Sequence, residues 1–459
     1  MEYLFSLLLF GFNLLDYEIG INRIAFLAVS VVLFGLMFYF IQRKTRDFLC
    51  TCVCAMCHTW PISWINILGE PSEVLQLPWF YLTGALIVLN ACVRIAKIKE
   101  NRVNAFILGI FFTVVFVSVY PLLISPSLLA GIKEFIIISF FIILTFAAFV
   151  QSSSLDEEKR DHIIDAYIWT AVISCVAIIV QYVYYNIFGI GIFKYSVGSY
   201  MGNTMMSCNL LMEDTSCATI MLGSAIFYML ERVNINDRRI KHLAAILITV
   251  IGLALTTRRT SIISLVICFA VYIPLRYKGI MNKVKMMSVL SIMVAVMISY
   301  LLIVRPVDDF SQYLDSNGRF ENYITSIRLF IRNPLGIGYD NGYLISMMKD
   351  IVPHNTILRW LNMCGFIFTL LMVILLVYFV RVAYNKKRND DMWVLLYCLL
   401  AMNFIPDLLN GRFFVIPCML VLLSPCAKKS GSEIEGLAKK QIRRAVNEKN
   451  TVLPARIKR

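Results

Sequence analysis

Long apolar segments recur along the whole of this 459-residue chain, and they decide what it can fold into. Many run for roughly 17–25 residues, the length that crosses a bilayer as a helix. Only 16% of the residues are charged and the mean hydropathy is +0.74, whereas soluble domains carry about 25% charged residues. Because no alternating barrel pattern is present, we expect an all-α, polytopic membrane protein whose helices satisfy their own backbone groups.

The net charge of +14 is unevenly distributed. Half of it lies in residues 427–459, which carry ten Lys/Arg and three Glu. We interpret this segment as a basic cytoplasmic tail attached to one membrane domain of residues 1–426. Nucleic-acid binding is the less favoured use of such a tail, so no nucleic-acid partner is expected. Met1-Glu2-Tyr3 lacks the features of a cleavable signal peptide, and the first helix is therefore expected to be retained.

Short loops rich in Lys/Arg mark the cytoplasmic side of a membrane protein. Six such loops and the tail alternate with pairs of apolar segments, which predicts about 12–14 transmembrane helices with both termini in the cytoplasm. The loops lie at Arg43–Arg46, Arg94–Arg102, Lys159–Arg160, Arg238–Lys241, Arg276–Lys285 and Arg381–Arg388. The expected spans are 3–16, 22–42, 49–69, 78–93, 103–122, 132–150, 163–186, 214–231, 243–257, 261–275, 287–304, 357–381, 392–408 and 411–425.

This assignment places four connections outside the cytoplasm: 188–212, 257–260, 305–356 and 409–412. The third is the longest polar stretch of the chain, with five Lys/Arg and six Asp/Glu. A surface site for polar chemistry is therefore expected to draw on it.

His354 is the histidine that falls on this outer side, just before the helix expected from residue 357. An imidazole titrates near neutral pH and can accept a hydroxyl proton as a general base. The alternative is a helix-entry residue that bonds to its own turn, with Asn355 or Thr356 as the cap.

Arg258 and Arg259 occupy a tight outward turn between two short spans, and Arg412 occupies another. Adjacent guanidiniums at a membrane face are costly unless they meet an anion or water. The planar fork of arginine matches a pyrophosphate. The alternative is that these side chains extend to the lipid headgroups.

The apolar spacing within the outer polar stretch predicts an amphipathic helix over 320–332. Its apolar side is expected to lie on the membrane surface or on the helical bundle. Arg328 and Arg332 then share one flank, available to phosphate or sugar; the alternative is a solvated or headgroup-facing flank. Pro334 and the glycines after it end this helix. The apolar positions are Phe320, Ile324, Ile327 and Ile331.

Glu213 and Asp214 precede the span that begins near residue 215. Acids at a helix N-terminus are favourable in themselves, and they can also position a sugar hydroxyl. Cys54-Ala55-Met56-Cys57-His58 matches a haem-attachment pattern. It lies in an apolar segment that starts on the cytoplasmic side, so we expect neither haem nor a metal nor any other cofactor.

These outward residues, taken in order, resemble a known family. The order is Arg319, then Asn333-Pro334-Leu335-Gly336-Ile337-Gly338-Tyr339, then His354-Asn355 leading into a helix. It resembles the O-antigen polymerase and ligase superfamily, whose Ser-Arg turn is similar to Thr256-Thr257-Arg258-Arg259, with Arg259 in the arginine position. Leu211–Thr215 resembles the Glu-Pro-Ser segment of polysaccharide polymerases but has Asp214 for proline and Thr215 for serine, which leaves the role of Glu213 open.

The resemblance implies a GT-C-like fold and metal-independent glycosyl transfer at the outer face of the bacterial cytoplasmic membrane. Its donor and acceptor would be oligosaccharides linked to undecaprenyl pyrophosphate. By this resemblance Arg259 neutralises the pyrophosphate leaving group, His354 deprotonates or orients the acceptor hydroxyl, and Glu213 is the third catalytic candidate. The residues expected to contact pyrophosphate or sugar are Arg258, Arg319, Arg328, Arg332, Arg412 and Asn355.

Three functions remain open. The favoured one is a polymerase that joins repeat units of O-antigen, capsule or exopolysaccharide, with a chain-length regulator and a flippase as partners. The second is a ligase that transfers a finished glycan to lipid A-core or another acceptor. The third is a lipid-linked sugar transporter, which is disfavoured because its charges should line a path at the midplane rather than helix ends.

Overall fold

A computed structural model gives the fold of this protein. It describes residues 1–63, 77–95, 105–200, 203–210, 215–235, 239–256, 258–277, 319–348 and 353–426, with scattered positions between 279 and 295. The basic tail, Glu213 and most of the expected span 287–304 lie outside these residues. The backbone of Arg259 and Arg319 is described, but their side chains are not.

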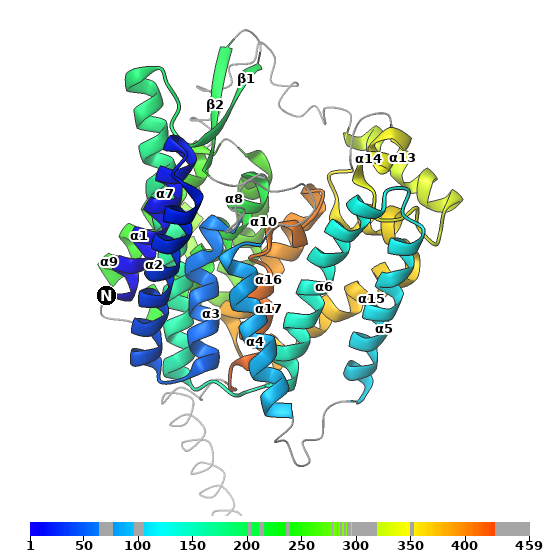
Figure 1. Ribbon diagram of the computed structural model, residues 1–459, viewed down its shortest axis with the longest axis horizontal. Coiled ribbons are helices and arrows are strands. Elements are labelled where there is room, and N and C mark those ends of the chain that lie inside the picture. Colours follow the sequence, from blue (N-terminus) through cyan, green and yellow to red (C-terminus); the bar gives the residue numbers. More distant parts are fainter. Residues whose placement is uncertain are drawn as a thin grey trace, which may run out of the picture.

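The described chain is a bundle of helices, as the apolar runs predict (Figure 1). Polar side chains begin several of them: Asn22, Asp47 and Asp156 each accept hydrogen bonds from the first turn that follows. The helices that correspond to expected spans are α1 (Glu2–Ile19), α2 (Arg23–Thr45), α3 (Phe48–Thr59), α4 (Trp79–Ile95), α5 (Ala105–Leu123), α6 (Leu128–Val150), α7 (Glu157–Phe188), α8 (Thr215–Ile235), α9 (Arg239–Leu255), α10 (Arg259–Arg276), α15 (Thr356–Asn385), α16 (Asn389–Ala401) and α17 (Val415–Leu423).

Four of these helices, α2, α6, α7 and α15, are long and apolar enough to cross a membrane, and five shorter apolar helices accompany them. The expected helical membrane fold is therefore confirmed, while the total of 12–14 spans stays a prediction. Two boundaries were wrong: α3 ends at Thr59, not near residue 69, and α16 ends at Ala401, not near residue 408. The Asn403 amide donates to the carbonyls of Leu399 (3.0 Å) and Leu400 (3.2 Å), which closes the helix end.

A β-hairpin is the exception to this helical architecture. Strands β1 (Lys194–Tyr200) and β2 (Asn203–Leu210) pair antiparallel, with Tyr200 opposite Asn203. The sequence pattern predicts only a connection there. In Figure 1 the hairpin projects from one end of the bundle.

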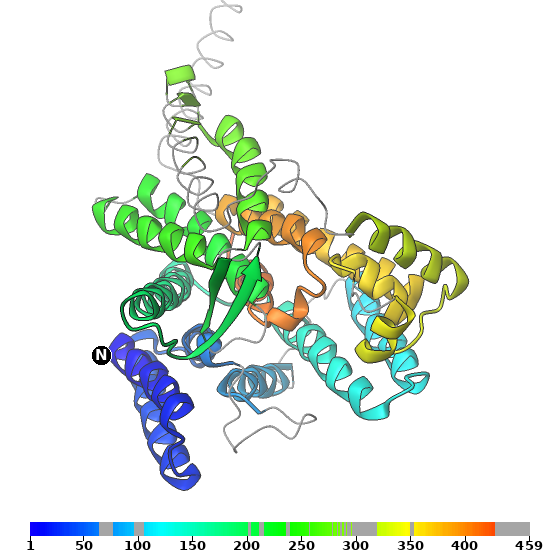
Figure 2. The same ribbon diagram turned by 90° about the horizontal axis from the view of Figure 1, so that it is seen from above.

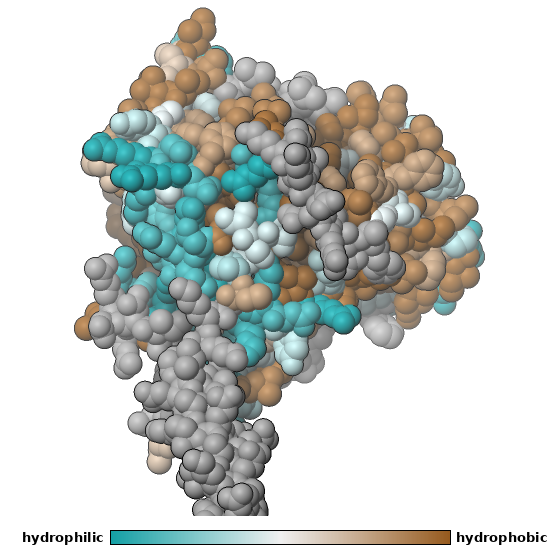
Figure 3. Space-filling model, turned by 90° about the horizontal axis from the view of Figure 1, so that it is seen from below, coloured by the Kyte–Doolittle hydropathy of each residue, from teal (hydrophilic) through white to brown (hydrophobic). Residues whose placement is uncertain are grey.

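The basic loops meet at the opposite end. Lys44 pairs with Glu2 at 2.9 Å, Lys159 with Asp47 at 3.3 Å, and the Arg160 guanidinium with Asp391 at 2.9 Å. Figure 3 views this end and shows a hydrophilic area bordered by apolar side surfaces. These basic residues lie at the end of the bundle opposite the hairpin, and Glu2 near the N-terminus lies with them. Which end faces the cytoplasm stays a prediction.

Candidate functional site

The site is built around a break in α15. Gly365 has φ 83° and ψ 178°, which splits the helix into residues 356–364 and 366–385. The break frees carbonyls that would otherwise bond within the helix. Ile337 N–H donates to the Asn362 carbonyl (2.8 Å) and Gly338 N–H to the Met363 carbonyl (3.0 Å).

The segment that fills the break is the Asn333–Tyr339 run, and its glycines explain how closely it packs. Gly336 has φ 90°, and a Cβ there would lie 2.5 Å from the Met363 carbonyl oxygen. A Cβ on Gly365 would meet the backbone of Leu335. Only glycine adopts such backbone angles at low cost and leaves room for this contact. The run therefore ties the outer polar stretch to α15.

His354 lies at the start of the first half of α15. Asn355 is the cap, because its side chain accepts from Leu358 N–H at 3.0 Å. The Tyr323 hydroxyl lies within hydrogen-bonding distance of two carbonyls, those of His354 (3.0 Å) and Asn403 (3.2 Å). His354 is half-buried, and its carbonyl lies against the Tyr323 hydroxyl.

Tyr323 belongs to α13 (Arg319–Arg332), which confirms the predicted amphipathic helix. Arg328 and Arg332 are exposed on it. The short helix α14 (Asn341–Met347) follows, capped by Asp340. Figure 2 views this end and shows α13 at the periphery of the bundle, beside α15.

The connection from residue 405 to 412 joins α15 to α8. The Thr356 hydroxyl donates to the Ile405 carbonyl (3.2 Å) and accepts from Leu408 N–H (3.1 Å). On the other side, the Cys217 thiol in the first turn of α8 donates to the Asp407 carbonyl at 3.5 Å. The N-terminal turns of α8 and α15 therefore meet across this connection.

A third helix N-terminus, that of α10, lies against α8. The Thr219 and Ser261 hydroxyls are hydrogen-bonded, and both residues are in the first two turns of their helices. Arg258 occupies the N-cap position of α10 and is half-buried. Its Nε has no hydrogen-bond partner among the described residues. Arg258 is thus brought to the same end of the bundle as His354.

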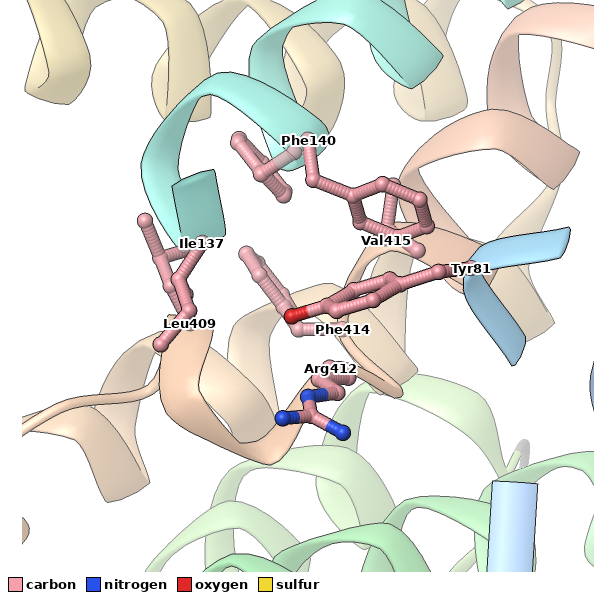
Figure 4. A pocket seen from close by; sticks show the side chains of 8 residues that line it. Tyr81, Ile137, Phe140, Leu409, Arg412, Phe414 and Val415 are labelled. Atoms are coloured by element: carbon pink, nitrogen blue, oxygen red, sulfur yellow. The ribbon is translucent and has the colours of Figure 1, made fainter. Parts of the chain in front are cut away.

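Arg412 lies deeper than expected. It is 5% exposed, its guanidinium donates to the Ser63 carbonyl, and its Cζ lies 4.7 Å from the centre of the Tyr81 ring. The pocket beside it, shown in Figure 4, has a cavity volume of about 10 Å³, near what one water requires. Contact between Arg412 and a pyrophosphate would require these partners to be given up, so its binding role stays a prediction.

A largely buried charged cluster, which the sequence pattern does not predict, lies beneath the site. Arg359, on α15, contacts the Asp407 carboxylate and donates to Glu134 of α6 at 2.8 Å. Burial raises the pKa of Asp407 to about 6, an effect that the charge of Glu134 adds to and Arg359 opposes. Arg359 and Asp407 each stand as a single charge in an apolar stretch of the sequence. Because a charge inside a membrane bundle needs a partner of opposite sign, such isolated charges indicate that a buried ion pair is present, although they do not identify the partners.

The structure therefore brings together the beginnings of α8, α10 and α15, with Arg258, His354 and Asn355 among them. Among the described residues no group of three or more His, Cys, Asp or Glu could hold a metal ion.

Residues 244–373 match the O-antigen ligase family. The match contains the proposed site residues except Glu213 and Arg412. It agrees with the resemblance found in the sequence and supports an O-antigen polymerase or ligase function in the membrane. No curated protein matches the chain.

Proposed function

From this O-antigen ligase match, we propose that the protein is a polymerase of lipid-linked glycans in the bacterial cytoplasmic membrane. Its substrates are oligosaccharide repeat units carried on undecaprenyl pyrophosphate, and it joins them on the outer face. The observation that carries the proposal is the meeting of three helix N-termini at one end of the bundle, with Arg258 and His354 beside them.

Helix N-termini present unpaired N–H groups and a partial positive charge, so they favour anions. Arg258 adds a guanidinium whose Nε lacks a hydrogen-bond partner in the described part of the chain. Arg259 is the next residue, and Arg319 begins α13. Positive charge at this position would stabilise a pyrophosphate leaving group, because negative charge develops on the pyrophosphate as its bond to the sugar breaks.

The reaction is a displacement at the anomeric carbon of the donor sugar. The acceptor hydroxyl forms the new glycosidic bond, the bond to pyrophosphate breaks, and His354 takes the hydroxyl proton. Arg258, Arg259 and Arg319 neutralise the departing pyrophosphate, so the proposed chemistry needs no metal. Glu213 is proposed to orient the acceptor sugar.

A ligase is the second candidate, because the family that matches residues 244–373 is described as O-antigen ligase. It would use the same residues and would differ in its acceptor, lipid A-core or another glycan carrier. The segment Leu211–Thr215, similar to one found in polymerases, favours polymerisation.

The test replaces His354 and Arg259 separately with alanine in cells that depend on this protein for long-chain polysaccharide. Each variant should lose the chain-length ladder while its amount in the membrane is unchanged. Arg381→Ala is the matched control, since Arg381 is exposed at the opposite end of the bundle. Wild-type ladders from both variants would refute the proposal. Single repeat units still attached to the lipid core would select polymerase over ligase.

A further inference from the structure

Helix α13 packs against the bundle with polar residues and exposes its apolar side. Its polar residues Asn322 and Ser326 are buried, and the Ser326 hydroxyl accepts from the Asn362 amide of α15. On the opposite side Ile324, Ile327 and Ile331 are 36%, 45% and 69% exposed. A helix on the surface of a soluble protein buries its apolar side instead. The exposed isoleucines are therefore expected to contact an apolar environment outside the protein.

Two cations lie beside this apolar side. Arg328 and Arg332 are four residues apart, so they share one flank of the helix, and both are exposed. Glu321 lies on the same flank. An apolar stripe bordered by arginines is the pattern of helices that lie in the membrane interface, with cations at the level of the lipid phosphates.

The apolar surface also continues from α13 onto a membrane span. Leu335, just after α13, is 56% exposed and packs on the break at Gly365. Phe366 and Ile367 follow that break and are about half exposed on α15, which is long and apolar enough to cross a membrane. Lipid that covers this part of α15 would also cover Leu335 and Ile331.

We propose that α13 lies in the bilayer interface, with its isoleucines in the acyl region and Arg328 and Arg332 at the lipid phosphates. The occupant of this surface is the bilayer itself. The placement does not depend on the proposed function. Because Tyr323 of α13 lies within hydrogen-bonding distance of the His354 carbonyl, lipid contact also sets the height of His354 relative to the membrane surface.

The experiment measures the depth of α13 in full-length protein reconstituted into nanodiscs of phosphatidylcholine and phosphatidylglycerol. A genetically encoded fluorescent amino acid is placed at position 331, 321 or 367; the chain's 13 cysteines make thiol labels ambiguous. Quenching by lipids brominated on their acyl chains is compared with quenching by aqueous iodide. Position 367 on α15 is the benchmark for lipid contact, and position 321 on the charged flank is the matched control.

We expect bromolipids to quench the probe at 331 as strongly as the probe at 367, and more strongly than the probe at 321. Quenching by iodide should show the reverse order, with the probe at 321 quenched more strongly than the probes at 331 and 367. The proposal fails if the probe at 331 is open to iodide, or if bromolipids quench it no more than the probe at 321.

The arginines are tested in the same assay. Arg328→Glu together with Arg332→Glu should reduce bromolipid quenching at 331, because the glutamates are repelled by phosphatidylglycerol. The matched pair Arg328→Lys and Arg332→Lys should leave quenching unchanged. Equal quenching in the two double variants, with both proteins monodisperse, would overturn the assignment of these arginines to lipid phosphates.

Discussion

The Arg359 guanidinium of α15 contacts the Asp407 carboxylate inside the bundle, and the same arginine reaches Glu134 of α6. One cation therefore joins the buried Asp407 and the half-buried Glu134, which come from different parts of the chain. Asp407 also accepts from Leu409 N–H at 2.9 Å, so the cluster holds the connection between α16 and α17. Thr356 bonds to this connection, which links the cluster to the helix end that carries His354.

Replacing Arg359 with alanine should destabilise the protein by about 3–5 kcal/mol, because the buried Asp407 and the half-buried Glu134 lose their counter-charge. Arg359→Lys should have a smaller effect because it keeps the positive charge, although it should still destabilise because an ammonium lacks the planar fork that serves both acids. Thermal unfolding in detergent checks both values. A loss in Arg359→Ala no larger than in the surface variant Arg381→Ala would contradict the assigned role.

Asp407 should give the protein a pH-dependent stability. An acid whose pKa is raised in the folded protein binds its proton more tightly there than when unfolded. Its contribution is therefore present below about pH 4 and is lost as the pH rises through about 6.

Asp407→Asn removes this titration. The difference in melting temperature between wild type and Asp407→Asn should change most between about pH 4 and pH 6. A difference that is constant over this range would mean that the pKa of Asp407 is not raised.

The sequence predicted those parts of the molecule that depend on local pattern. Run length located the membrane helices, and the spacing of Ile324, Ile327 and Ile331 located α13. The spacing did not tell which side of α13 would be buried, because that depends on the buried contact between Ser326 and Asn362. Local pattern says nothing of such a contact.

Contacts between distant residues could not be predicted in this way. Arg359 lies 48 residues from Asp407 and 225 from Glu134, so nothing in the sequence pairs them. The break at Gly365 was missed for a related reason. A glycine inside an apolar run looks like any other helix residue until the Asn333–Tyr339 run packs against it.

Gly365→Ala and Gly336→Ala should each destabilise the protein by roughly 1–3 kcal/mol through backbone strain, with the steric overlap adding to it. Both should also reduce the chain-length ladder, because the run that ties the outer stretch to α15 would separate from it. Gly109→Ala in α5 is the control, since a Cβ there meets nothing within 4 Å. It should be neutral or stabilise by up to about 1 kcal/mol. Equal melting temperatures for all three variants would count against the packed break.

Tyr323→Phe tests whether α13 positions His354. The variant loses the hydroxyl that lies within hydrogen-bonding distance of the His354 and Asn403 carbonyls but keeps the ring. If the hydroxyl fixes the base, transfer should slow by about tenfold, the equivalent of one hydrogen bond, with little change in the KM for the lipid-linked donor. The measurement is initial-rate kinetics with purified protein in nanodiscs. Tyr343→Phe on α14 is the matched control, because its hydroxyl makes no hydrogen bond to the described residues. A rise in KM at unchanged kcat would instead assign Tyr323 to donor binding.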